Sequence, residues 1–184
     1  HRRDLGPGRH TGAGNGDEEM KELLITGAWR CGEQQVQALE QMGYAVTFWP
    51  DERQAVNMDT QRFEAVICGG LFLTTPIERF PALKCIQVTS AGLDRVPLDY
   101  CKTHGITVYN AGGVYSAPMA EFVLGGILQL YKESKFFAEN QAAHRWEKHR
   151  GLRELSGKTA CIIGTGSVGS AIARRLRAFD VQTV

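Results

Sequence analysis

The chain has 184 residues, of which 43% are hydrophobic and 22% charged, and 21 basic side chains against 20 acidic ones give a net charge of +1. This balance is typical of a globular protein and excludes a strongly basic surface, so we expect no nucleic-acid partner. The apolar stretch 122–131 is too short and too rich in glycine to span a bilayer, and we expect no membrane partner.

The first 19 residues differ in composition from the rest. They contain five glycines and only one large apolar residue, Leu5, so they cannot contribute to a core. We therefore predict a disordered extension over residues 1–19. Met20 begins a clear strand pattern, and we interpret it as the natural start, with the preceding tract as an added extension.

From Met20 onwards, short apolar runs alternate with helical patterns. Strands separated by helices pair in parallel through right-handed crossovers, so the sequence predicts an α/β fold with an open, doubly wound parallel sheet. The predicted strands are 23–26, 44–48, 65–68, 85–88 and 106–109, and the predicted helices are 33–42 and 98–103.

Glycine-rich loops follow three of these strands, at 69–70, 90–92 and 110–113. Glycine lets backbone N–H groups approach a ligand closely, and doubly wound sheets bind ligands at the carboxyl ends of their strands. For any one loop, a tight turn explains the glycines equally well. Three such loops at the same sheet edge favour a ligand site.

A long amphipathic helix is predicted next, from an N-cap at Ser116 to about Asn140, with Pro118 in its first turn. A helix of this length spans roughly 30 Å, enough to cross from one domain to another. After a polar stretch, the pattern restarts with a strand at 159–163, a helix at 167–179 and a strand at 181–184.

The turn between that strand and that helix carries a Gly-x-Gly-x-x-Gly motif. Gly164 permits the tight turn, Gly166 removes a side chain where a pyrophosphate comes near, and Gly169 allows helix and strand to pack closely. The motif alone is weak, but here it follows an apolar strand and opens a helix whose N-terminus attracts phosphate. The predicted cofactor-binding residues are Gly164, Thr165, Gly166, Ser167, Val168 and Gly169.

The motif does not decide between NAD and NADP. An acidic residue about 20 positions after the first glycine holds the ribose hydroxyls in NAD enzymes. Counted from Gly164, that position falls beyond Val184, and Asp180 comes too early. No Gly-Lys-Ser/Thr follows, which disfavours a kinase-type phosphate loop.

The cysteines indicate a reducing compartment. They stand singly, without a Cys-x-x-Cys pair, and their number is odd, which favours reduced thiols in a cytoplasmic protein without a metal site. We also expect no signal peptide before the first predicted strand. Three cysteines lie in apolar strand-like runs, where we expect them to be buried: Cys68, Cys85 and Cys161.

Four further segments, 86–94, 108–111, 119–124 and 155–159, stand in a fixed order before the glycine motif. Together they resemble the D-isomer-specific 2-hydroxyacid dehydrogenase family, over Met20 to Val184. The resemblance implies a flavodoxin-like substrate domain at 20–116. It implies that the crossing helix and a truncated Rossmann domain follow at 117–184, and that the full-length protein is a homodimer.

The resemblance also assigns roles to individual residues. Backbone N–H groups after the third strand hold the substrate carboxylate in the family, which implies Gly69, Gly70 and Leu71. Tyr115 matches a position that often faces substrate or nicotinamide, although many members have Asn there. Glu121 is interpreted as structural. Asp180 replaces a glycine at the helix end, and Asp tolerates the left-handed conformation.

The implied chemistry is hydride transfer between NAD or NADP and a small 2-hydroxy or 2-keto acid. In the family it requires an arginine, a glutamate and a general acid/base histidine, which lie downstream of this chain. None of the five histidines matches that position, and His144 and His149 are expected to be solvated. We therefore assign no catalytic residue and expect this chain alone to be inactive.

Two other functions remain open at this stage. The chain could be a non-catalytic module that senses a dinucleotide or a small carboxylate, and the residues that follow Val184 would discriminate it from an enzyme. A flavodoxin-like flavin-binding protein is a weaker alternative, because the glycine motif belongs to the second predicted sheet and not to the first.

Overall fold

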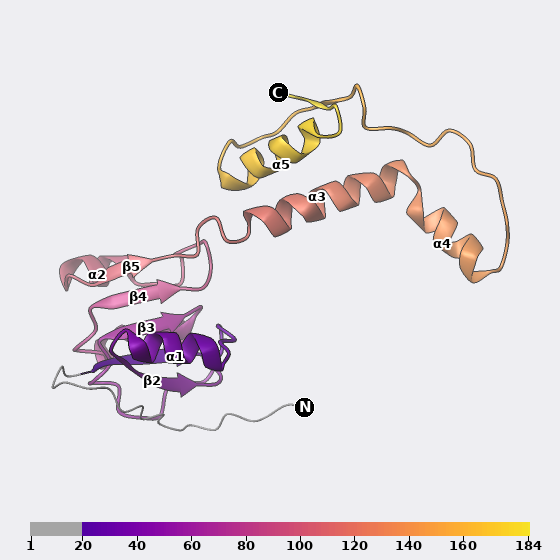
Figure 1. Cartoon of the computed structure of the whole chain (residues 1–184). Coiled ribbons are helices and arrows are strands. Elements are labelled where there is room, and N and C mark those ends of the chain that lie inside the picture. Colours follow the sequence, from indigo (N-terminus) through magenta and orange to yellow (C-terminus); the bar gives the residue numbers. More distant parts are fainter. Residues whose placement is uncertain (1–19) are drawn as a thin grey trace. The chain divides into compact units, whose positions relative to one another are not determined.

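The computed structural model describes residues 20–184, and the predicted extension at 1–19 lies outside the described residues. The chain divides into two compact units between Gly112 and Gly113. Each unit has its own helices, strands and core, and the helices and strands are labelled in Figure 1. No helix within residues 20–184 has the length and apolar character needed to cross a membrane.

The first unit is a five-stranded sheet in the order β2-β1-β3-β4-β5, with every neighbouring pair parallel. This confirms the predicted doubly wound α/β arrangement. The chain order reverses between β1 and β3, which makes the edge above these two strands the topological switch point. The elements are β1 (Lys21–Thr26), α1 (Glu33–Gln41), β2 (Tyr44–Trp49), β3 (Ala65–Cys68), η1 (Leu71–Leu73), η2 (Ile77–Arg79), β4 (Cys85–Val88), α2 (Leu98–Thr103) and β5 (Thr107–Tyr109).

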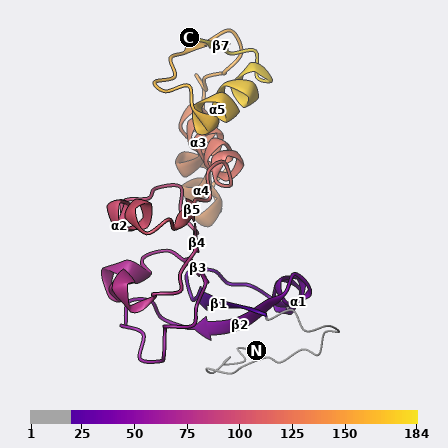
Figure 2. The same ribbon diagram turned by 90° about the vertical axis from the view of Figure 1, so that its left-hand side faces the viewer.

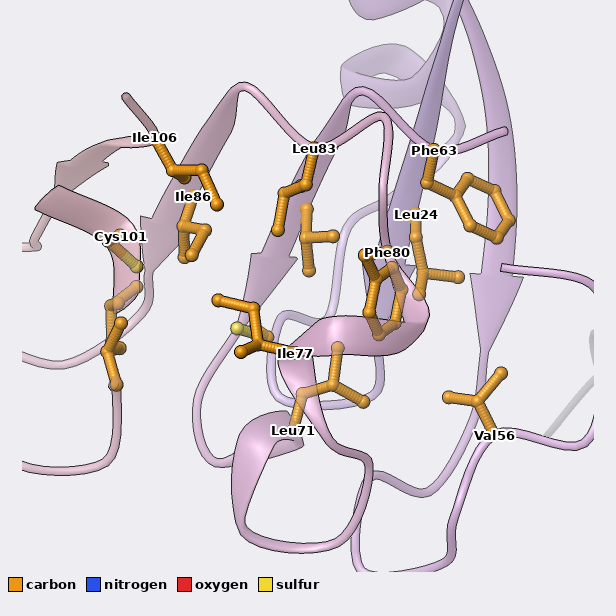
Figure 3. Packing of buried hydrophobic residues seen from close by; sticks show 14 of the residues in the cluster. Leu24, Val56, Phe63, Leu71, Ile77, Phe80, Leu83, Ile86, Cys101 and Ile106 are labelled. Carbon is orange, nitrogen blue, oxygen red and sulfur yellow. The ribbon is translucent and has the colours of Figure 1, made fainter. Parts of the chain in front are cut away.

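Both faces of this sheet are covered, because successive strand residues point to opposite sides. On one face, Leu24, Val66 and Ile86 pack against the 3₁₀ turns η1 and η2 and against α2, and all three are at most 1% exposed (Figure 3). On the other face, Leu23 and Ile25 pack against α1, which lies beside β1 and β2 (Figure 2). Burial on both faces explains why these strands are nearly continuous apolar runs.

The second unit contains two helices that pack on a short parallel sheet. Leu124 from α3 and Leu176 from α5 form its core together with Leu155 and Val181. Backbone hydrogen bonds extend the strand pairing beyond its assigned ends, as from Val184 N to Ala160 O at 3.0 Å. The elements are α3 (Ser116–Tyr131), α4 (Ser134–Ala142), β6 (Thr159–Ala160), α5 (Ser167–Arg177) and β7 (Gln182–Thr183).

The prediction of one helix from Ser116 to about Asn140 is wrong. The helix ends at Tyr131, because Glu133 adopts a left-handed conformation with φ of 47° before α4 begins. Ser116 is also no N-cap: it is the first helical residue, and no side chain caps this end. An interrupted helix with a regular apolar pattern cannot be distinguished from a continuous one by periodicity.

The expectation that His149 is solvated is wrong as well, whereas His144 is exposed. His149 Nε2 lies 2.9 Å from a Glu133 carboxylate oxygen, and its side chain is only 28% exposed. Its ring packs on Phe136 with centroids 4.5 Å apart. The chain after α4 therefore folds back onto the break between the two helices.

The strand β6 is shorter than predicted, and Cys161 is exposed where we expected burial. Ala160 and Ile162 face the helices, so Cys161 and Ile163 point to the opposite face of the two-stranded sheet. No residue among 20–184 covers that face, and Ile163 is 99% exposed. Cys68 is buried as predicted, Cys85 is half-buried, and all five cysteines are free thiols.

Asp180 has φ of 56°, so the predicted left-handed conformation at the end of α5 is confirmed. We expect Asp180→Gly to raise the free energy of unfolding by about 0.5–1 kcal/mol, because glycine has no Cβ to clash in this conformation. Ala178→Gly, at φ of −68°, should instead lower it by about 0.5–1 kcal/mol. Urea unfolding of both variants checks this, and a loss of stability in Asp180→Gly would contradict it.

Candidate functional site

The glycine loop of the second unit has the geometry of a phosphate-binding turn. Gly164 has φ of 106°, which only glycine adopts without strain, and Gly166 is the N-cap of α5. A Cβ at Gly169 would stand 2.0 Å from the Gly164 carbonyl oxygen. Two of the three glycines are therefore required by the protein's own backbone.

Gly166 is the exception, because a Cβ there would meet no atom within 4 Å. Open space at this position fits the approach of a pyrophosphate to the N–H groups that begin α5. Ser170 Oγ donates to the Thr165 carbonyl at 3.1 Å and fixes the loop on the helix. A cavity of about 310 Å³ adjoins the loop, lined by residues that include Gly164, Thr165, Gly169, Ser170, Ala173 and Val184.

The predicted motif residues are thus brought together at one helix N-terminus. Thr165, Gly166 and Ser167 are exposed, and Val168 is half-buried. Glu121, interpreted as structural from the sequence, forms an ion pair with Arg175 of α5 at 3.2 Å. That pair joins α3 to α5 within the second unit. The residues present fit a dinucleotide, since they leave room and free N–H groups where its phosphates would lie.

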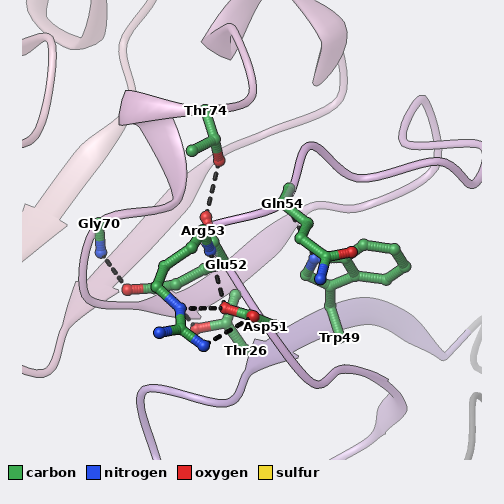
Figure 4. A network of polar contacts seen from close by, with 8 residues as sticks. All are labelled: Thr26, Trp49, Asp51, Glu52, Arg53, Gln54, Gly70 and Thr74. Carbon is green, nitrogen blue, oxygen red and sulfur yellow. Dashed lines mark hydrogen bonds and ion pairs between the residues drawn. The ribbon is translucent and has the colours of Figure 1, made fainter.

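In the first unit, the loop after β3 forms a notch at the topological switch point. Gly69 N donates to Glu52 Oε2 at 3.0 Å, and Gly70 N donates to Glu52 Oε1 at 2.5 Å. Thr26 Oγ1, at the end of β1, donates to Glu52 Oε2 at 2.7 Å. We call these three donors, from Thr26, Gly69 and Gly70, the carboxylate notch; Figure 4 shows Glu52 beside two of its donor residues, Thr26 and Gly70.

Glu52 belongs to the loop after β2, and neighbouring contacts hold the main chain of that loop. Thr74 Oγ1 donates to the Glu52 carbonyl at 2.7 Å, and Trp49 Nε1 donates to the Gln54 carbonyl at 3.3 Å. The preceding residue, Asp51, does not bind the notch: its carboxylate accepts from Arg53 Nε at 2.8 Å. Hydrogen bonds from Arg53 lower the pKa of Asp51.

The Cys68 thiol lies directly below the notch at the end of β3. Burial, with the nearby charge of Glu52 as a second cause, raises the pKa of Cys68 to about 12. The thiol is therefore protonated near neutral pH and cannot serve as a nucleophile. Its role is to fill the core beneath the loop, where it is 1% exposed.

Sequence reasoning identified Gly69, Gly70 and Leu71 but missed Glu52 and Thr26. Leu71 is fully buried, so its side chain belongs to the core, and only its backbone faces the loop. Tyr115 lies in the second unit, immediately before α3, and is 48% exposed. A signal for Glu52 existed, since an acidic pair follows β2 at the carboxyl edge of the sheet.

The other two glycine loops meet at the same edge, as their strand order requires. Ala111 N donates to the Ser90 carbonyl at 2.9 Å, and Asn110 Nδ2 donates to the Ala91 carbonyl at 2.7 Å. Gly112 N donates to Asn110 Oδ1 at 3.2 Å. These hydrogen bonds join the two loops to each other, whereas the loop after β3 binds the carboxylate of Glu52.

Comparison with known proteins identifies the family. The family model "D-isomer specific 2-hydroxyacid dehydrogenase, catalytic domain" matches residues 24–174. The chain is 31% identical over 144 residues to a glyoxylate reductase of Thermofilum pendens, which covers 73% of this chain and 42% of that protein. The chain therefore spans less than half the length of this relative.

Solved structures show the same fold. A D-lactate dehydrogenase from Aquifex aeolicus, complexed with NAD and lactic acid, matches with a TM-score of 0.70 at 24% identity, over 88% of this chain and 50% of that one. An NADPH-dependent glyoxylate/hydroxypyruvate reductase from Sinorhizobium meliloti, in complex with NADP and malonate, matches with a TM-score of 0.66 at 22% identity. That match covers 89% of this chain and 52% of the solved chain.

The two glycines of the notch allow a matched test. A Cβ at Gly69 would lie 2.9 Å from Glu52 Oε1, 3.1 Å from Ala28 Cβ and 3.2 Å from Thr89 Oγ1, whereas a Cβ at Gly70 has no atom closer than 3.5 Å. We expect Gly69→Ala to lower the free energy of unfolding by about 1–3 kcal/mol, because it overpacks the notch. Gly70→Ala should change it by less than about 0.5 kcal/mol. Equal losses in the two variants, measured by urea unfolding, would contradict the geometry.

Proposed function

Because the chain belongs to the D-isomer specific 2-hydroxyacid dehydrogenase family, we propose that the whole protein is an oxidoreductase acting on a small 2-hydroxy or 2-keto acid. NAD or NADP is the proposed cofactor. The α/β fold shared with solved dehydrogenases supports this proposal. The glycine loop at the start of α5 is the observation that carries it.

That loop would hold the cofactor through its backbone. A nicotinamide dinucleotide supplies the hydride donor or acceptor when it is bound. The N–H groups of Ser167 and Val168, at the start of α5, would face the pyrophosphate, and Gly166 leaves the space for it. Gly164 and Gly169 keep the turn tight. Thr165 borders the adjoining cavity.

The substrate carboxylate would bind at the loop after β3, to the N–H groups of Gly69, Gly70 and Leu71. The two hydrogen bonds that Glu52 accepts from Gly69 and Gly70 support this assignment, because a carboxylate fits the loop there. Tyr115, which matches a position that often faces substrate or nicotinamide in the family, is a further proposed substrate-binding residue. The two solved relatives were bound to lactic acid and to malonate, both small carboxylic acids.

The proton transfer needs a general acid/base that we do not assign to this chain. His149 is bound to Glu133 and packs on Phe136, so its side chain has a structural role within the second unit. The other described histidines, His104 and His144, are exposed and stand apart from both loops in sequence. We propose that the catalytic groups belong to the part of the family fold that residues 20–184 do not include.

We also propose that the whole protein is a cytoplasmic homodimer. The five free thiols support the reducing compartment. Large apolar side chains on α3 support association, since Met119, Phe122 and Leu130 are each at least half exposed. Apolar side chains clustered on one exposed helix are typical of a surface that another subunit covers.

Turnover assays test the proposed reaction. We expect the whole protein, at the length of its relatives, to oxidise NADH or NADPH in the presence of a 2-keto acid such as glyoxylate, measured as loss of absorbance at the nicotinamide band. The 184-residue chain alone should show no turnover, because it lacks the acid/base group. Turnover by the 184-residue chain would contradict the proposal that the acid/base group lies outside it. If the whole protein binds the nucleotide without turnover, a sensor is favoured instead.

Gly166→Ala tests the cofactor loop directly. The added methyl group meets no protein atom, so the fold should tolerate it, but it enters the space assigned to the pyrophosphate. We expect NADH to bind about tenfold more weakly to the 184-residue chain, measured by calorimetry. Gly126→Ala on α3, where a Cβ also meets nothing within 4 Å, is the matched control and should leave the affinity unchanged.

A further inference from the structure

The carboxylate notch of the first unit already holds a carboxylate, that of Glu52 (Figure 4). We propose that Glu52 is an internal competitor of the substrate carboxylate and thereby sets the affinity of the substrate site. This inference rests on the proposed function, which assigns the substrate carboxylate to Gly69 and Gly70. It adds an affinity-determining residue that touches the same two donors.

The position of Glu52 is that of a ligand. In open α/β sheets, ligands bind outside the carboxyl ends of the strands, where the chain order reverses. Here the reversal lies between β1 and β3, and Glu52 accepts hydrogen bonds from the end of both strands, through Thr26 and through Gly69 and Gly70. Its side chain therefore occupies the place where this fold class binds its ligands.

The notch has donors for one carboxylate and not for two. Glu52 Oε2 accepts from Thr26 Oγ1 and Gly69 N, and Glu52 Oε1 accepts from Gly70 N, so every donor of the notch is used. A second carboxylate at the same N–H groups would stand beside the charge of Glu52, and like charges a few ångströms apart repel strongly in a half-buried site. Binding of a substrate carboxylate there requires Glu52 to leave.

Glu52 can leave without dismantling the notch. Its main chain is held separately, by the bond from Thr74 Oγ1 to the Glu52 carbonyl, so release needs only rotation of the side chain. The loop keeps its own bonds, from Leu73 N to the Gly70 carbonyl at 3.0 Å and from Thr89 N to the Cys68 carbonyl at 2.8 Å. The vacated donors would then be arranged for another carboxylate.

Competition of this kind has a defined effect on affinity. If Glu52 occupies the notch for about nine-tenths of the time, the apparent dissociation constant of a small carboxylate is about tenfold higher than it would be without Glu52. A substrate must therefore gain additional binding free energy from its other groups, such as its 2-oxo or 2-hydroxyl oxygen, to offset this loss of affinity. Glu52 would thus weaken every carboxylate by the same factor, and only a ligand with further contacts would bind at low concentration.

Oxalate binding to the 184-residue chain tests the inference, followed through the ¹⁵N–¹H signals of Gly69 and Gly70 at constant ionic strength. We expect Glu52→Gln and Glu52→Ala to bind oxalate about tenfold more tightly than the unmodified chain. Asp51→Asn is the matched control: it removes a neighbouring negative charge that binds Arg53 and not the notch. Its dissociation constant should equal that of the unmodified chain.

A second measurement needs no variant and covers the case in which Glu52→Ala fails to fold. In the unmodified chain, saturating oxalate should shift the ¹³C signal of the Glu52 carboxylate, because that group loses three hydrogen bonds when it leaves. Added chloride at the same ionic strength should not shift it.

Two results would overturn the inference, and they differ in what they leave standing. If oxalate shifts Gly69 and Gly70 with the same dissociation constant in all variants, Glu52 does not compete, and the substrate site stands. If oxalate leaves Gly69 and Gly70 unshifted in every protein while NADH still binds, the competition and the substrate site both fail. The cofactor assignment then survives alone.

Discussion

Unpaired backbone N–H groups at the ends of parallel strands are the constraint that shapes both units. A parallel strand ends in a loop whose amides have no ladder partner, and a half-buried amide without an acceptor is costly. In the first unit, Gly69 and Gly70 satisfy theirs with the Glu52 carboxylate. In the second unit, the loop from Gly164 to Gly169 opens α5 with free N–H groups beside a cavity.

The two loops differ in how much of their shape the protein itself requires. Gly169 is fixed by the Gly164 carbonyl, whereas the space at Gly166 is shaped by nothing in the described chain. At Gly69 the neighbouring atom is a carboxylate oxygen from the same protein. The amides of that loop are satisfied by an internal carboxylate when no ligand is bound. At Gly166, by contrast, no atom of the described chain requires a glycine, because a Cβ there would meet nothing within 4 Å.

The sequence predicted the elements whose residues are buried on both sides and missed those that depend on distant partners. The strands β3 and β4 have the predicted bounds, because each is a short, mostly apolar segment whose residues are all buried or half-buried. The break at Glu133 was missed, since the apolar pattern continues through it and the contact of Glu133 with His149 comes from a later loop. Cys161 was misjudged because its burial depends on which face of the sheet is covered, and a strand pattern does not specify that.

Glu52 illustrates the same limit at the candidate site. Its donors lie 17, 18 and 26 residues away along the chain, so no local pattern links them. The motif glycines are local, so the sequence alone was enough to propose them as one loop at the start of a helix. A site assembled across a sheet edge can be predicted only as far as the strand order is known. Once the order β2-β1-β3 is established, an acidic residue after β2 and glycines after β3 become neighbours, and their hydrogen bonds follow from that topology.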